Sequence, residues 1–136
     1  MSQSESTNAH RDKPRKELIF VVDDEPLLVE MAQTVLDAEG YQIRAFCDPE
    51  NALQAIEESD RKPDLLITDC LMGSMDGLEL IDRCRRVQPG LKTLLLSGTV
   101  DESFLRQQAV KPDKFLPKPY RVKTLLKVVE DILQGR

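Results

Sequence analysis

From Leu18 onward, short apolar runs alternate with segments in which apolar residues recur three or four positions apart. A continuous apolar run of roughly four to eight residues is typical of a strand buried on both faces of a parallel sheet. The wider spacing is typical of a helix with one buried face. The alternation predicts an α/β fold, a five-stranded parallel sheet covered by helices on both sides. The predicted strands are 18–22 (LIFVV), 41–46 (YQIRAF), 65–68 (LLIT), 91–97 (LKTLLLS) and 114–120 (KFLPKPY, with a turn).

Proline, glycine and aspartate mark the ends of the predicted helices. Pro26 suits the first turn of the first helix, and Gly40 suits its C-terminal end. Asp48 and Pro49 start the second helix, the aspartate as a cap and the proline in the first helical position. The remaining helices are expected at about 75–87, at 101–109 and from about 122 to 135.

Each predicted helix carries one apolar face, which we expect to pack against the sheet. The pattern is weakest in the fourth helix and clearest in the last. The residues expected to face the core are Leu28, Met31, Ala32, Val35 and Leu36 in the first helix, Ala52, Leu53 and Ile56 in the second, Leu78, Ile81 and Cys84 in the third, Phe104, Leu105 and Ala109 in the fourth, and Val122, Leu125, Leu126, Val129, Ile132 and Leu133 in the last.

The chain divides into a polar start and one domain. Residues 1–17 carry almost nothing that could be buried, which predicts a disordered tail followed by a domain at 18–136. The single histidine, His10, lies in that tail, so a histidine-based catalytic or metal centre is disfavoured. The 136 residues, 40% of them apolar, fit one core, and with 4% aromatic residues that core must be aliphatic.

Charge and cysteine content narrow the class of protein. The net charge of -5 argues against direct nucleic-acid binding, which needs a positive face. Cys47, Cys70 and Cys84 follow no metal-binding spacing, and we interpret them as reduced, small buried residues. No apolar run approaches the roughly 18–20 residues of a membrane helix, and the N-terminus lacks the apolar stretch of a secretory signal. A cytoplasmic protein without membrane contact is expected.

Polar side chains follow four of the five predicted strands. Asp23 and Asp24 come after the first strand, Asp69 after the third, Ser97 ends the fourth and Lys118 follows the fifth. Right-handed crossovers bring the C-terminal ends of parallel strands to one edge of the sheet, where ligands bind. We therefore expect these five side chains to lie close together.

Three neighbouring carboxylates need compensation, because two unit charges 4 Å apart repel by roughly 4 kcal/mol at an effective dielectric constant near 20. Either one acid stays protonated or a cation lies among them, and carboxylate oxygens suit Mg²⁺. Lys118 adds a second positive charge and Ser97 a hydroxyl donor. This set suits phosphoryl transfer to a carboxylate nucleophile. Gly73 and Gly77 let the backbone after Asp69 approach closely.

The order of these groups resembles the receiver domain of bacterial two-component response regulators. The order is Asp-Asp after the first strand, Asp after the third, Ser after the fourth and Lys-Pro after the fifth, and the resemblance covers about Leu18 to Gln134. It implies a doubly wound, flavodoxin-like (βα)5 fold with strand order 2-1-3-4-5. Taken singly, each motif is common, and Asp69, Ser97 and Lys118 could each be ordinary turn or surface residues.

Carried over to this chain, the resemblance implies a phosphorelay site. Asp69 would accept a phosphoryl group from a histidine kinase or phosphotransfer partner. Asp23 and Asp24 would hold Mg²⁺ together with Asp69 and the backbone carbonyl of Leu71. Lys118 would contact the phosphoryl oxygens, and its bond to the following proline would be cis.

The resemblance also implies a switch. Ser97 would hydrogen-bond the new phosphoryl group, and Phe115 holds the aromatic position whose ring changes packing in response. Phosphorylation would shift the packing of the fourth helix, fifth strand and last helix. Gly73 replaces the usual proline, which loosens the turn after Asp69. Leu71 is apolar and cannot orient an attacking water, so slow self-dephosphorylation is expected.

Two other interpretations remain. A Mg²⁺-dependent phosphatase-type enzyme would form an aspartyl phosphate from an external substrate, but such enzymes usually carry the nucleophile after the first strand and a cap, for which no residues are left. A degenerate receiver would bind partners only. We therefore expect no enzyme beyond self-catalysed phosphoryl transfer. The domain is either a stand-alone regulator that binds a protein target, as a monomer or weak dimer, or a receiver fragment of a larger regulator or hybrid kinase.

Overall fold

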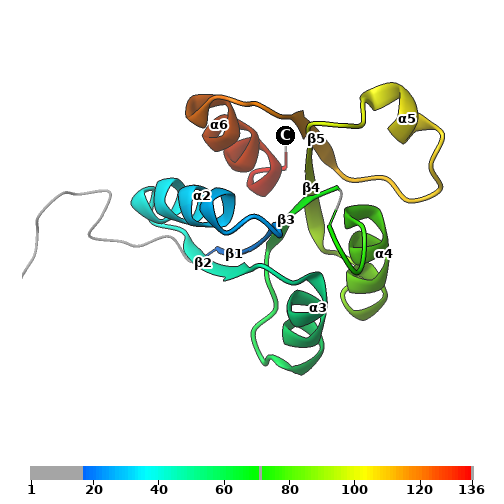
Figure 1. The fold of residues 1–136 in the computed structure, drawn as a ribbon. Coiled ribbons are helices and arrows are strands. Elements are labelled where there is room, and N and C mark those ends of the chain that lie inside the picture. Colours follow the sequence, from blue (N-terminus) through cyan, green and yellow to red (C-terminus); the bar gives the residue numbers. More distant parts are fainter. Residues whose placement is uncertain (1–16, 71, 136) are drawn as a thin grey trace, which may run out of the picture.

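Strands and helices alternate along the whole domain, as the hydrophobic pattern predicts. The computed structural model describes residues 17–70 and 72–135, so the predicted tail lies, apart from Glu17, outside the described residues. The elements, drawn in Figure 1, are β1 (Leu18–Val22), α2 (Pro26–Ala38), β2 (Gln42–Phe46), α3 (Pro49–Glu58), β3 (Leu65–Asp69), α4 (Gly77–Val87), β4 (Lys92–Ser97), α5 (Glu102–Arg106), β5 (Lys114–Pro117) and α6 (Val122–Leu133).

The sheet is fully parallel, with strand order β2-β1-β3-β4-β5. The predicted fold class and strand order are confirmed. The direction of winding reverses between β1 and β3, which is where α/β sheets of this kind bind ligands. The register sets Val22 opposite Thr68 and Asp69 opposite Leu96, so the polar residues after these strands meet at one edge.

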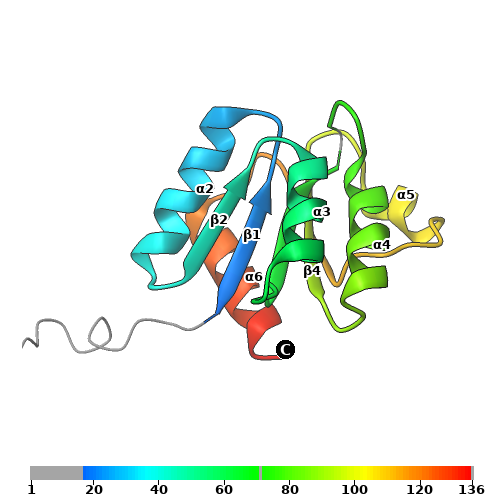
Figure 2. The same ribbon diagram turned by 90° about the horizontal axis from the view of Figure 1, so that it is seen from below.

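Two apolar cores flank the sheet. In β1, Phe20 faces the core beneath α3 and α4, whereas Ile19 and Val21 face the core beneath α2 and α6, as the two-residue period of a strand requires. Figures 1 and 2 show α2 and α6 on one side of the sheet and α3 and α4 on the other. No helix within residues 17–70 and 72–135 combines the length and apolar character needed to cross a membrane.

The predicted faces of three helices need correction. Met31, Val122 and Phe104 were expected in the core, but they are exposed, with Met31 at 42% and Phe104 at 43%. In α2 the buried positions are Val29, Ala32 and Leu36. Apolar residues on more than one side of this helix made its periodicity ambiguous, and only packing decides which side is covered.

Helix α5 is shorter than the predicted 101–109. It ends at Arg106, where the Lys111 ammonium donates hydrogen bonds to the carbonyl oxygens of Arg106 and Gln108 at 3.0 and 2.6 Å. Leu105 is its single buried residue, and Ala109 lies in the exposed segment beyond the helix. One helical turn can bury little more than one side chain, which explains why the expected face is not formed.

Aspartate side chains cap three of the described helices, and of these caps only Asp48 was predicted. The side chains of Asp48, Asp76 and Asp101 accept hydrogen bonds from backbone N–H groups in the first turns of α3, α4 and α5. Because Asp76 is the cap, α4 starts at Gly77 rather than at the predicted residue 75. Gly40 follows α2 with φ of +93°, the left-handed conformation that ends many helices.

Candidate functional site

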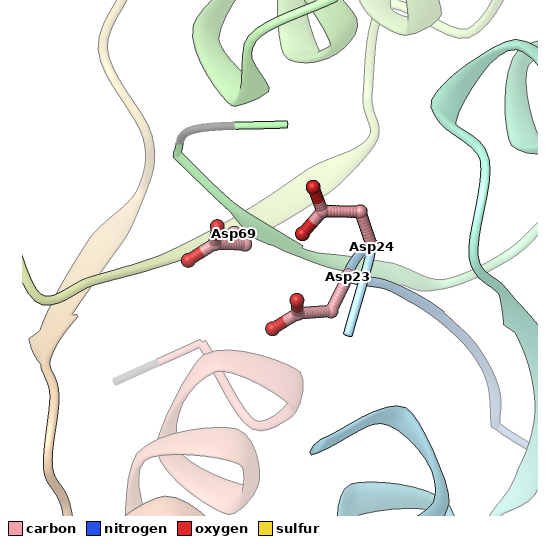
Figure 3. Close-up of side chains that lie close together, drawn as sticks. All are labelled: Asp23, Asp24 and Asp69. Carbon is pink, nitrogen blue, oxygen red and sulfur yellow. The ribbon is translucent and has the colours of Figure 1, made fainter. Parts of the chain in front are cut away.

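Three carboxylates meet at the C-terminal edge of β1 and β3. Asp23 and Asp24 follow β1, and Asp69 ends β3, the neighbouring strand. One oxygen of each carboxylate lies within 4.8 Å of those of the other two, and Figure 3 shows the side chains of Asp23 and Asp24 directed to the same side as Asp69. Asp23 is buried, with 4% exposure, whereas Asp24 is exposed. The structure therefore brings together the three predicted acids, one of them open to solvent.

Lys118 joins this group from beyond β5. Its ammonium nitrogen lies 2.9 Å from Asp23 Oδ2 and 2.9 Å from Asp69 Oδ1. The backbone N–H of Lys118 donates to the carbonyl oxygen of Ser97 at 2.8 Å, which fixes the strand end that carries it. The Lys118–Pro119 peptide bond is cis. One cation thus bridges the first and third strands through their carboxylates.

Burial and charge set the protonation of this pair. Burial raises the pKa of Asp69, the hydrogen bond from Lys118 opposes that rise, and the charge of Asp23 adds to it. For Lys118, burial lowers the pKa, but hydrogen bonds to Asp69 and Asp23 outweigh burial and leave it above the usual value. The lysine therefore stays charged at neutral pH, where it offsets the repulsion between the two carboxylates.

The donor set fits a magnesium ion. With Mg²⁺–oxygen distances of about 2.1 Å, adjacent ligands lie about 3.0 Å apart and opposite ligands about 4.2 Å apart, so carboxylate oxygens within 4.8 Å of one another can close around an ion through side-chain rotation. The exposed Asp24 leaves room for the water ligands that Mg²⁺ keeps. Leu71, whose carbonyl is the fourth predicted protein ligand, lies outside the described residues.

The Ser97 hydroxyl stabilises the turn that directly follows β4. Its side chain is 2% exposed, and Oγ accepts hydrogen bonds from the N–H groups of Thr99 and Val100, both at 3.1 Å. Phe115 is partly buried against the core beneath α3 and α4. The predicted switching roles of Ser97 and Phe115 remain predictions.

Gly77 is the glycine that the site requires. A Cβ atom at position 77 would lie 2.3 Å from the carbonyl oxygen of Asp69 and 2.9 Å from Leu95 Cδ1. The N–H of Gly77 also donates to the carbonyl oxygen of Cys70 at 2.7 Å, which folds the loop back onto β3. At Gly73 an added Cβ would meet nothing within 4 Å. Of the two predicted glycines, only Gly77 permits a close backbone approach.

Comparison with known families shows which protein family carries this arrangement of polar residues. The family model described as the response regulator receiver domain matches residues 19–130, which includes all five of the polar side chains after the strands. The chain belongs to the response regulator receiver domain family.

This receiver domain is similar to parts of longer regulators. It is 34% identical over 116 residues to the DNA-binding response regulator MtrA of Mycolicibacterium smegmatis. The matched region covers 82% of this chain and 48% of that protein. It is 29% identical over 117 residues to the sensor kinase CckA of Brucella abortus, covering 85% of this chain and 12% of that protein. The receiver domain thus spans less than half the length of these relatives.

Solved structures agree with the fold. The CheY-like receiver domain protein from Methanospirillum hungatei JF-1 superposes with a TM-score of 0.81 at 23% identity, covering 89% of this chain and 96% of that one, which bears on the fold alone. NtrX from Brucella abortus gives a TM-score of 0.79 at 30% identity, covering 89% of this chain and 28% of that one.

Tyr120 is a site residue that the sequence pattern did not single out. Burial raises the pKa of its phenol, the charge of Lys118 lowers it and that of Asp23 raises it. It lines a hollow of about 290 Å³ together with Leu28, Met31, Lys118 and Pro119. The sequence feature that could have identified Tyr120 is its position two residues after Lys118.

The three cysteines of the receiver domain differ in exposure. Cys70 and Cys84 are buried as expected, but Cys47 is exposed, because it follows the edge strand β2. Burial raises the pKa of Cys70 to about 11, with the charges of Asp76 and Asp69 adding to the effect. Burial also raises the pKa of Cys84 to about 12.

Iodoacetamide at pH 8 should therefore modify Cys47 in the folded protein and leave Cys70 and Cys84 intact. The thiolate is the nucleophile, and a thiol with a pKa near 11 is ionised in about one molecule in a thousand at this pH. Peptide mass spectrometry over a time course gives the three rates, and unfolding in guanidinium should equalise them. Labelling of Cys70 as fast as Cys47 in the folded protein would contradict this prediction.

Proposed function

We propose that this receiver domain is a phosphoacceptor switch that receives a phosphoryl group on Asp69 from a histidine kinase or phosphotransfer protein. Asp23, Asp24 and Asp69, with the carbonyl of Leu71, would hold Mg²⁺. The observation that carries the proposal is the convergence of three carboxylates and the Lys118 ammonium at one edge of the sheet, with both Lys118 contacts at 2.9 Å. A nucleophile, a cation and a set of hard oxygen ligands are what phosphoryl transfer to a carboxylate needs.

The proposed reaction moves one phosphoryl group between proteins. A carboxylate oxygen of Asp69 attacks the phosphorus of a phosphohistidine, an acyl P–O bond forms, and the P–N bond breaks. The electron pair of that bond goes to the imidazole, which takes up a proton. Lys118 neutralises charge on the transferring oxygens, and a bound Mg²⁺ would supply further neutralisation and orient those oxygens.

The output of the switch follows from Ser97. Its hydroxyl would exchange the N–H groups of Thr99 and Val100 for the phosphoryl group, which releases the turn between β4 and α5. Phe115 and the face made by α5, β5 and α6 would then repack and change the contacts with a protein target. Receiver domains are signalling switches rather than enzymes with external substrates, and the apolar Leu71 favours slow loss of the phosphoryl group.

Incubation with acetyl phosphate and Mg²⁺ should add one phosphoryl group to the wild-type chain and none to Asp69→Asn. Intact-mass spectrometry measures the modification directly. The exposed Asp60→Asn variant is the matched control and should be modified like the wild type. Chelation of Mg²⁺ should suppress the reaction. Modification of Asp69→Asn to the wild-type extent would refute the proposed acceptor, and steady hydrolysis of a phosphomonoester would favour the phosphatase alternative.

The phosphodonor protein would dock on the first helix beside the site. Leu27 is 78% exposed and Met31 lies on the same helix, although both side chains are large and apolar. Met31 lines the hollow that Lys118 and Tyr120 also line, so this apolar surface is continuous with the edge that carries Asp69. A partner packed against Leu27 and Met31 would bring its phosphohistidine close to Asp69. This role would account for the exposure of two large apolar side chains.

The double variant Leu27→Glu/Met31→Glu should lower phosphoryl transfer from a phosphotransfer protein by about tenfold or more, because apolar anchors dominate such interfaces. Phosphorylation by acetyl phosphate should stay unchanged, since the small donor needs no docking surface. Val87→Glu, at an exposed apolar position on α4, is the control. Radiolabel transfer assays measure both reactions. Equal losses with both donors would indicate damage to the fold rather than to docking.

A further inference from the structure

A second hollow, of about 360 Å³, lies between α4 and the segment from Val100 to Val110. Its apolar lining includes Leu78 of α4 and Phe104 of α5, and Phe104 remains 43% exposed. The short helix α5 buries only Leu105, so it does not close this space. Neither Asp69 nor Lys118 lines the hollow, which separates it from the phosphoacceptor site.

Two residues of its wall are tied to the phosphoacceptor machinery. Cys70 directly follows Asp69, and its carbonyl oxygen accepts the hydrogen bond from Gly77. Val100 donates its N–H to Ser97 Oγ at 3.1 Å. If the proposed switching moved the Ser97 hydroxyl away from Val100, this wall of the hollow would lose its anchor. We therefore expect the hollow to differ in shape between the two states of the switch.

The rim of the hollow is negative. Asp76, Glu79 and Asp82 line it from α4, and no lysine or arginine is among its lining residues within the described part of the chain. The Asp76 carboxylate accepts a hydrogen bond from the backbone N–H of Glu79. Glu79 and Asp82 pair with arginines one helical turn away, but these pairs are solvent-exposed and contribute little. A cation at the rim would therefore compete with Arg83 and Arg86 for two of the three carboxylates, and these five side chains together keep a negative charge.

We infer that this hollow binds a small amphiphilic cation and thereby holds the receiver domain in its unphosphorylated state. The ligand class is an ammonium or guanidinium group on an aromatic or short aliphatic body. The volume lies within the range of roughly 300–1,000 Å³ that small-molecule sites occupy, and the exposed Phe104 ring offers stacking and cation–π contact. The regulatory half of the inference rests on the proposed function, whereas the binding half does not.

Titration with 2-phenylethylamine, followed by ¹H–¹⁵N NMR of the full chain, tests binding. The amide signals of Gly77, Val100 and Phe104 should shift saturably, whereas neutral 2-phenylethanol and anionic 3-phenylpropanoate should bind more weakly. Glu79→Gln/Asp82→Asn should weaken amine binding roughly three- to tenfold, since exposed charge pairs contribute modestly. Ala109→Leu, which fills the hollow from its exposed side, should abolish binding.

Binding to Asp69→Asn separates this inference from the proposed function. The amine should bind that variant as it binds the wild type, because Asp69 does not line the hollow. In the wild type, a saturating amine concentration should slow phosphorylation by acetyl phosphate at least about fivefold, and the phosphorylated protein should bind the amine more weakly than the unphosphorylated protein. A wild-type rate in the presence of bound amine would overturn the regulatory half.

Absence of saturable shifts, or equal affinity for the amine and the two control ligands, would overturn the binding half. Unchanged amine affinity in Glu79→Gln/Asp82→Asn would also overturn the binding half. These surface substitutions preserve side-chain shape, so the test holds even if Ala109→Leu does not fold.

Discussion

Replacement of Lys118 by methionine should slow phosphorylation by acetyl phosphate about 100- to 1,000-fold, the usual loss when one charge-stabilising donor is removed from a reaction site. Lys118 is the described cation in contact with both Asp23 and Asp69, and methionine keeps its length without its charge. The exposed Lys114→Met, at the start of β5, the strand that leads to Lys118, is the control and should react at the wild-type rate. Quenched-flow or mass-spectrometric time courses measure both.

The same substitution should change how stability depends on pH. Without the hydrogen bond from Lys118, burial and the charge of Asp23 would raise the pKa of Asp69 further. A carboxyl group whose pKa is raised by folding stabilises the fold at low pH and loses that contribution as pH rises through its folded pKa. In Mg²⁺-free buffer, Lys118→Met should therefore be destabilised at pH 7 and recover relative to wild type as pH falls toward about 4. A pH-independent difference in chemical denaturation would contradict this account.

Gly77→Ala should destabilise the protein by about 1–3 kcal/mol, the usual cost of overpacking a fixed backbone. The added Cβ would lie 2.3 Å from the Asp69 carbonyl oxygen, and a backbone atom cannot turn aside as a side chain can. Relief must move α4 or the end of β3, so the phosphorylation rate should fall as well.

Gly73→Ala, only four residues away, is the matched control. It meets no atom within 4 Å and should leave stability unchanged or raise it slightly, because alanine restricts the unfolded chain. Denaturant unfolding and acetyl phosphate kinetics on both variants give the comparison. Equal effects at the two positions would show that the loop is freer than its close contact with Asp69 indicates.

The sequence was sufficient for the sheet and for the gathering of the acids. Apolar runs that stop at Asp23 and Asp69 locate strand ends, and the handedness of crossovers brings those ends to one edge whatever the packing details. The resemblance then supplied the strand order. None of this needed knowledge of individual side-chain contacts.

Sequence patterns could not predict which way individual side chains point. In α2, Leu27, Leu28, Val29 and Met31 are all apolar, so spacing could not tell which of them packs and which stays exposed. Nothing in the pattern indicated that the Ser97 hydroxyl bonds its own turn, or that Gly77 rather than Gly73 contacts Asp69. These features depend on distances between elements that meet only in the folded chain.

Under the proposed function, the two amides that hold Ser97 Oγ would also set how often the unphosphorylated protein adopts the signalling conformation. Each such hydrogen bond contributes about 1 kcal/mol net, so a spontaneous release of both costs about 2 kcal/mol. At that cost, only a few molecules in a hundred adopt the signalling conformation by chance. Under this proposal, background output would depend on a turn of four residues, and a threonine at position 97, which keeps the hydroxyl, would change that background more than the maximum response.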